Sequence, residues 1–214
     1  MAAIAAWLAV LSLSALWVRR CWDAQREWSR KLIHIGAGAV APLAWWLGIE
    51  AAVAVPAAGV VTLMAALNHR MRVLPAIEDI DRASYGTVAY GASITLLLWL
   101  YWPVQPSAVT AGVLVMALGD GLAGLVGPAV PSLSWHLWKQ RKSLAGTGAM
   151  AAASLVVLVG LRAFCLDQGL PTPGLPALVG ITAAAVSLEQ VAVLGIDNFT
   201  VPMAVGCLWN SLAH

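Results

Sequence analysis

The stretch AVTAGVLVMALGDGLAGLVG, residues 108–127, decides the fold of this chain. A helix needs about 20 mostly apolar residues to cross a bilayer, and this stretch has that length with a single charge, Asp120. Similar apolar runs cover residues 3–18, 32–48, 51–67, 87–102, 144–164, 175–194 and 199–213. The sequence therefore predicts an all-α, multi-pass transmembrane helix bundle. We expect eight spans, or seven if the first run is a signal anchor or the short last run does not cross.

The composition of the whole chain excludes a soluble domain. Of its 214 residues, 61% are hydrophobic and 10% are charged, whereas globular domains are roughly half apolar and a quarter charged. A net charge of +2 is too small to indicate a nucleic-acid partner. Because no linker or low-complexity tract separates the apolar runs, we expect one integral membrane domain over residues 1–214. The sequence does not indicate an oligomeric state.

Basic residues predict the direction of the spans. All lysines and arginines except Arg162 lie in three segments, at residues 19–31, 70–82 and 139–142. Such residues in short loops mark the cytoplasmic side, and an alternating path brings all three segments to that side. Both termini are then non-cytoplasmic, and we expect the plasma (inner) membrane with a reaction site facing the cytoplasm. Residues 135–139, WHLWK, are expected to lie along the lipid surface.

Arg30, Lys31 and His34 form the first polar cluster, at the start of the predicted span 32–48. Residues three and four apart share a helix face, so these side chains meet at the membrane boundary. Cations at a helix N-terminus are unfavourable unless an anion neutralises them, and phosphate is an anion that suits Arg and helix amides. The alternative is that the two cations only anchor the helix at the headgroups while His34 packs internally.

Asp120 lies between Gly119 and Gly121 near the end of the span 108–127. A carboxylate near a helix C-terminus is unfavourable without a cation, and the glycines allow the backbone to approach a ligand. Mg²⁺ on nucleotide phosphates would satisfy this carboxylate, because Mg²⁺ prefers one or two carboxylates plus phosphate oxygens. The alternative is an Asp120 paired with a neighbouring Arg, with glycines that serve helix packing.

Two further clusters lie where the later spans begin or end. The first is Lys142-Ser143 with Gly146 and Thr147, in which Ser143 is a candidate N-cap. The lysine cation, the hydroxyl groups and the free helix amides together suit phosphate. The glycine-rich segment that begins a P-loop is absent. The second cluster contains Glu189, Asp197 and Asn198. Glu189 lies in an apolar run and should face the bundle interior. Asp197 could cap the last helix, or it could bind a metal or accept a proton from a hydroxyl.

In this order the clusters resemble the polyprenol kinase family, whose members include phytol, farnesol and dolichol kinases and CTP-dependent diacylglycerol kinases. The resemblance covers about residues 29–206 and leaves the span 3–18 outside it. It is carried by Arg30-Lys31-x-x-His34, Tyr85-Gly86-Thr87-x-x-Tyr90, Gly119-Asp120-Gly121-Leu122-Ala123, Lys142-Ser143-x-x-Gly146-Thr147, Glu189 and Asp197-Asn198-x-Thr200-x-Pro202.

The resemblance implies an enzyme that moves the γ-phosphoryl group of CTP to a membrane isoprenoid alcohol or diacylglycerol with the help of Mg²⁺. Nucleotide binding is expected at Arg30, Lys31, Gly119, Gly121, Lys142, Ser143, Gly146 and Thr147. Metal binding is expected at Asp120, Asp197 and Asn198, and catalytic roles at Asp120, Glu189, His34 and Lys142.

One residue departs from the family pattern: Ala145 stands where members commonly carry Glu. If that Glu binds metal in relatives, Asp120 and Asp197 must suffice in this chain. Two alternative functions also fit a membrane protein with these clusters. One is a CTP:phosphatidate cytidylyltransferase, although its expected Lys-Asp and His-Gly-Gly motifs are absent. The other is a non-enzymatic carrier or scaffold, whose polar groups would lie near the bilayer centre rather than at one face.

Overall fold

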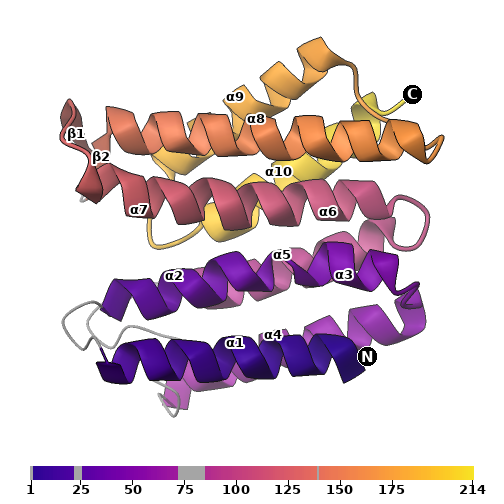
Figure 1. Cartoon of the computed structure of the whole chain (residues 1–214), viewed down its shortest axis with the longest axis horizontal. Helices are drawn as coiled ribbons and strands as arrows, with labels where there is room; N and C mark the ends of the chain where they lie inside the picture. The colour runs from indigo at the N-terminus through magenta and orange to yellow at the C-terminus, as the bar shows by residue number, and fades with distance from the viewer. Residues whose placement is uncertain (1, 22–25, 72–84, 139) are drawn as a thin grey trace.

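The computed structural model of the chain describes residues 2–21, 26–71, 85–138 and 140–214. Helices form nearly all of it, together with one π-helical segment and one two-stranded hairpin (Figure 1). The elements are α1 (Ala2–Cys21), α2 (Arg26–Ala37), α3 (Val40–Trp46), α4 (Ala51–Met71), α5 (Gly86–Tyr101), α6 (Pro106–Leu114), the π-helix η2 (Val115–Asp120), α7 (Gly121–Ala129), β1 (Ser134–Leu137), β2 (Gln140–Ser143), α8 (Leu144–Asp167), α9 (Leu175–Val191) and α10 (Asp197–Leu212).

Several long helices run along the same axis of the molecule, as membrane spans do. Four helical segments of the described chain are long and apolar enough to cross a bilayer: α1, α4, the continuous segment Pro106–Ala129 and α8. The apolar helices α5 and α9 are shorter, at 16 and 17 residues. An all-α membrane protein is therefore confirmed, while the predicted count of seven or eight spans stays a prediction.

The predicted span 32–48 is interrupted in the structure. It consists of α2 and α3, which are separated at Gly38 and Ala39. A Cβ atom on Gly38 would lie 2.3 Å from the Cβ atom of Ala117, so only glycine lets this break lie against η2. Lys31 of α2 lies beside Asp120, and α3 continues toward the opposite end of the bundle (Figure 1).

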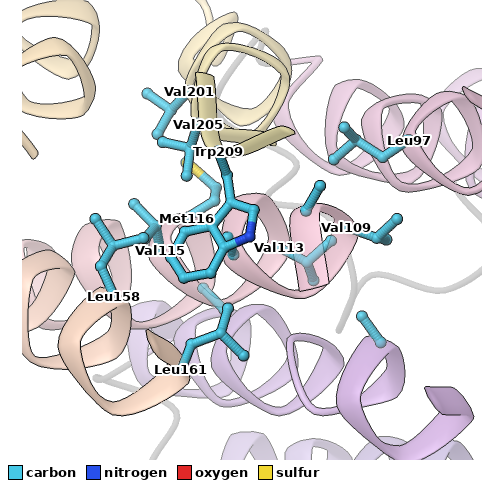
Figure 2. Packing of buried hydrophobic residues seen from close by; sticks show 14 of the residues in the cluster. Leu97, Val109, Val113, Val115, Met116, Leu158, Leu161, Val201, Val205 and Trp209 are labelled. Carbon is cyan, nitrogen blue, oxygen red and sulfur yellow. The ribbon is translucent and has the colours of Figure 1, made fainter. Parts of the chain in front are cut away.

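The segment α6–η2–α7 forms the centre of the bundle. More than half of its apolar window is buried within the protein, against 6% for α4. Figure 2 shows Val201, Val205 and Trp209 of α10 and Leu158 of α8 packed with Met116 and its neighbours. The indole nitrogen of Trp209 donates a hydrogen bond to Ser107 Oγ at 3.1 Å, which satisfies the polar atom of a fully buried ring. Asp120 is thus attached to the best-packed part of the molecule.

A β-hairpin joins α7 to α8, where the sequence predicted a stretch lying on the lipid surface. Its strands pair antiparallel, with Trp135 opposite Lys142 and His136 opposite Arg141. Trp138 follows β1 with a positive φ of 56° and an exposed side chain. This hairpin is a departure from an entirely helical fold, and its contact with lipid stays a prediction. The hairpin lies at one end of the bundle and both chain termini lie at the other (Figure 1).

Candidate functional site

The four polar clusters of the sequence meet at the hairpin end of the bundle. A cavity of about 660 Å³ opens there between α2, α7, β2, α8 and α9, a volume typical of small-molecule sites. Eight of the residues singled out from the sequence line it: Arg30, Lys31, Asp120, Lys142, Ser143, Gly146, Thr147 and Glu189. These residues come from segments separated by up to about 160 positions in the sequence, so folding alone brings them together.

Lys31 and Asp120 form the first ion pair of the cavity. The Lys31 ammonium donates to Asp120 Oδ2 at 2.8 Å and to the Asp120 carbonyl at 3.1 Å. His34 Nε2 lies 3.4 Å from the same carboxylate oxygen and 3.3 Å from the Met116 carbonyl. The sequence predicted a cation beside this carboxylate, and the structure supplies a lysine and an imidazole from α2.

Glycines on α7 and η2 allow this contact. A Cβ atom on Gly121 would lie 2.4 Å from Ile35, and one on Gly124 would lie 2.5 Å from the Lys31 ammonium. A Cβ atom on Gly119 would lie 2.5 Å from the sulfur of Met150 on α8. Helix packing therefore explains Gly119 and Gly121. Neither glycine is among the described residues that line the cavity. Their predicted contact with nucleotide stays a prediction.

The helix that carries Asp120 changes its winding at that residue. Residues Val115–Asp120 form a π-helix between two α-helical segments. Such wide turns are rare and occur often at functional sites. The turn ends at Asp120, and the Met116 carbonyl within it faces the His34 ring. The only carboxylate of the central segment thus sits at an irregular turn, with its side chain still partly exposed to the cavity.

Lys142 and Glu189 form the second ion pair. The Lys142 ammonium, on β2, contacts Glu189 Oε1 and donates to the Glu189 carbonyl at 2.9 Å. Gln190 Nε2 donates to Glu189 Oε2 at 2.9 Å and to Thr147 Oγ1 at 2.9 Å. Thr147 in turn donates to the Ser143 carbonyl. The end of α9 is therefore linked to both the hairpin and the first turn of α8.

Ser143 caps α8 as predicted. Its hydroxyl oxygen accepts a hydrogen bond from the Gly146 amide at 3.2 Å. Gly146 also lies close to α7, because an added Cβ atom would be 3.2 Å from the Ala123 carbonyl and 3.4 Å from Gly127. The cationic Lys142 thus lies beside a helix N-terminus, where amides and the macrodipole favour an anion.

Asp197 and Asn198 lie at the start of α10. Neither belongs to the described residues that line the cavity. The N-cap of α10 is Ile196, so Asp197 is not the cap that the sequence allowed. Asp197 precedes the predicted span 199–213. Burial and next the negative charge of Asp120 raise the pKa of Asp197 to about 6.

The residues present fit a metal ion that arrives with a ligand. No group of three or more His, Cys, Asp or Glu side chains suited to metal binding occurs among the described residues. Asp120 nevertheless lines the cavity, beside the lysines that suit phosphate. Mg²⁺ needs only one or two carboxylates when phosphate oxygens and water complete its shell. The site therefore suits Mg²⁺ bound to phosphates better than a metal held by protein alone.

Sequence reasoning gave no site role to Gln190 or Trp28, although the side chains of both line this cavity. Gln190 carries a signal in retrospect, because it is a second polar residue at the end of an apolar run. Trp28 lies just before the predicted span 32–48, where a tryptophan is equally typical of the membrane interface. No signal in the sequence distinguishes the two uses of a tryptophan near a helix start.

Comparison with known proteins gives two relatives. A protein named phytol kinase from Synechocystis sp. is 36% identical over 200 residues, which cover 93% of this chain and 85% of the relative. A protein named probable phytol kinase 3, chloroplastic, from Glycine max is 25% identical over 193 residues, which cover 82% of this chain and 60% of the relative. No family profile matches the chain, and no solved structure does. The names of the relatives describe kinases rather than a cytidylyltransferase, carrier or scaffold.

Proposed function

The chain belongs to the polyprenol kinase family, with relatives named phytol kinase, and is a membrane lipid-alcohol kinase; we propose that it transfers the γ-phosphoryl group of CTP to phytol or a similar isoprenoid alcohol. Farnesol, dolichol and diacylglycerol are the other acceptors to be compared. The reaction takes place in the cavity at the hairpin end of the bundle, on the side that the basic segments mark as cytoplasmic. The membrane is the plasma (inner) membrane in this proposal.

One observation carries this proposal: two lysine–carboxylate pairs, Lys31–Asp120 and Lys142–Glu189, line the same cavity. A triphosphate needs cations, and its metal needs a carboxylate. Without ligand, each lysine neutralises the carboxylate beside it, which avoids an unpaired charge at a poorly solvated site. A bound triphosphate offers the lysines a stronger anionic partner and frees the carboxylates for a cation or a hydroxyl.

The roles of the chain's own residues follow from their positions. Arg30, Lys31 and Lys142 hold the phosphates, with the Ser143 hydroxyl and the amides near Gly146 and Thr147 beside them. Phosphoryl transfer needs mainly positioning and charge stabilisation, so a cationic cradle of this kind supplies much of the catalysis.

Glu189 orients the alcohol or accepts its proton, since it lines the cavity near the end of α9 and is otherwise buried. His34 holds Asp120 in place through the contact at 3.4 Å. Asp120 and Asp197, with Asn198 beside them, hold the divalent cation. When bound, that cation neutralises phosphate charge and makes the phosphorus accessible to attack.

A direct transfer assay tests the proposal. The purified protein in phospholipid nanodiscs would receive CTP labelled at the γ-phosphate, Mg²⁺ and phytol, farnesol, dolichol or diacylglycerol, with ATP and UTP in parallel reactions. We expect labelled phosphate on phytol and unlabelled CDP as the other product. Transfer from ATP or UTP but not CTP would contradict the proposed donor, and transfer to diacylglycerol alone would contradict the proposed acceptor.

A further inference from the structure

Gln190 occupies a position that its own hydrogen bonding does not favour. Its amide nitrogen donates both of its hydrogens, one to Glu189 Oε2 and one to Thr147 Oγ1, each at 2.9 Å. Its amide oxygen is buried and has no hydrogen-bond partner among the described residues. A buried acceptor without a partner costs about 1–3 kcal/mol, so the amide keeps this orientation because another contact requires it.

The contact that requires it is the one with Glu189. Rotating the amide by 180° would place its oxygen against the Glu189 carboxylate and against Thr147 Oγ1, whose hydrogen is already donated to the Ser143 carbonyl. Two oxygen acceptors without a hydrogen between them repel, whereas a hydrogen bond from an amide to a charged carboxylate is worth more than one between neutral groups. The orientation of Gln190 is therefore set mainly by the negative charge of Glu189, with the Thr147 hydroxyl oxygen as a second, neutral acceptor.

We propose that Gln190 is a positioning residue that holds the Glu189 carboxylate in place when Lys142 moves to the phosphates of the nucleotide. This inference rests on the proposed function. Glu189 Oε1 contacts Lys142 and Oε2 contacts Gln190, so each oxygen has its own donor. When Lys142 leaves, the buried carboxylate loses its cation, and Gln190 remains as the donor that fixes its direction.

Thr147 gives this arrangement its rigidity. Its hydroxyl accepts from Gln190 and donates to the Ser143 carbonyl at 3.0 Å. The amide is therefore held by the first turn of α8, which does not depend on the position of the Lys142 side chain. A support anchored to α8 can keep Glu189 directed at the alcohol while the nucleotide draws the lysine away.

A double-mutant cycle tests the inference. Gln190→Met keeps the length of the side chain and removes both donors, and Gln168→Met at the exposed end of α8 is the matched control. We expect Gln190→Met to lower kcat about 10- to 100-fold, as for the loss of a hydrogen bond to a charged group. The KM values for CTP and the alcohol should change less than about threefold, because neither substrate contacts Gln190 in this account. In a Glu189→Gln background the same substitution should lower kcat less than about twofold further.

The alternatives give different results. A purely structural role would lower kcat equally in both backgrounds. A substrate-binding role would raise KM at unchanged kcat. Either of these results, or no effect of Gln190→Met in the wild-type background, would overturn the inference. Gln190→Glu supplies a second test that does not need an active Glu189→Gln enzyme. The glutamate keeps the shape of the side chain but cannot donate to Glu189, so we expect kcat at least as low as in Gln190→Met, and recovery of wild-type kcat would overturn the inference. Absence of transfer by the wild-type enzyme would instead refute the proposed function.

Discussion

Lys142→Met separates the two contributions that this account assigns to the lysine, one to folding and one to catalysis. The substitution keeps the length of the side chain and removes its charge. Glu189 then loses the ammonium that contacts its carboxylate, although only 9% of that side chain is exposed to solvent. Removal of one partner from a buried ion pair costs about 3–5 kcal/mol, a large share of a total stability of about 5–15 kcal/mol.

The double variant Lys142→Met with Glu189→Gln distinguishes this explanation from a general packing defect. It leaves no unpaired charge, so we expect the free energy of unfolding to return to within about 2 kcal/mol of the wild type, the remaining loss being hydrogen bonds. Unfolding would be followed by titration with dodecyl sulfate in mixed micelles. Arg20→Met is the control, because it removes an exposed cation at the end of α1, outside the cavity.

Activity should behave differently from stability in the same variants. Lys142 holds phosphate in the proposed reaction, so kcat/KM for CTP should fall roughly 10- to 150-fold in the single variant, as for lost bonds to charged groups. The double variant should be no more active than the single variant despite its regained stability, because it also lacks the Glu189 carboxylate. A single variant as stable as the wild type, or a double variant no more stable than the single, would refute the reasoning about the ion pair.

Three further predictions address the Asp120 side of the site. Asp120→Asn leaves an oxygen for Lys31, so the free energy of unfolding should change by no more than about 1–3 kcal/mol. Phosphoryl transfer should fall at least about 100-fold. Transfer within threefold of the wild type would contradict the role assigned to Asp120. Gly124→Ala places a Cβ atom 2.5 Å from the Lys31 ammonium and should raise KM for CTP. The control Gly148→Ala, with no atoms within 4 Å of the new Cβ, should leave KM unchanged. Equal effects of the two substitutions on KM would count against phosphate binding by Lys31. Because the pKa of Asp197 is raised to about 6, protons compete with the cation below that pH. The Mg²⁺ concentration for half-maximal transfer should therefore fall as the pH rises from 5.5 to 7.5, and a constant value would argue against metal binding by Asp197.

The membrane class and the clustering of charged side chains could be predicted, because both follow from the free-energy cost of placing polar groups in hydrocarbon. Apolar runs of about 20 residues have few uses outside a bilayer, and a carboxylate such as Asp120 in such a run needs a cation. The same reasoning predicted that Lys31 and Lys142 would face anions. It could not say which anion each meets without ligand, because the pairing of Lys31 with Asp120 depends on how α2 lies against α7.

The parts that sequence reasoning did not reach depend on close contacts between distant segments. Glycine next to Asp120 is compatible with ligand approach and with helix packing, and only the positions of Ile35 and Met150 show the packing use. The break at Gly38 lies against Ala117, and a hydropathy pattern contains no information about such a contact. In the hairpin, β1 (SWHL) alternates polar and apolar residues over only four positions and β2 (QRKS) is polar throughout, so the period-2 signal was too short to indicate a pair of strands.

The central claim is that the two lysine–carboxylate pairs open to receive one triphosphate in the cavity at the hairpin end. The most direct test is an experimental structure of the protein in lipid with Mg²⁺ and a non-hydrolysable CTP analogue. The account predicts phosphates contacting Lys31 and Lys142, with both lysines displaced from Asp120 and Glu189. An analogue bound elsewhere, with both ion pairs intact, would contradict it.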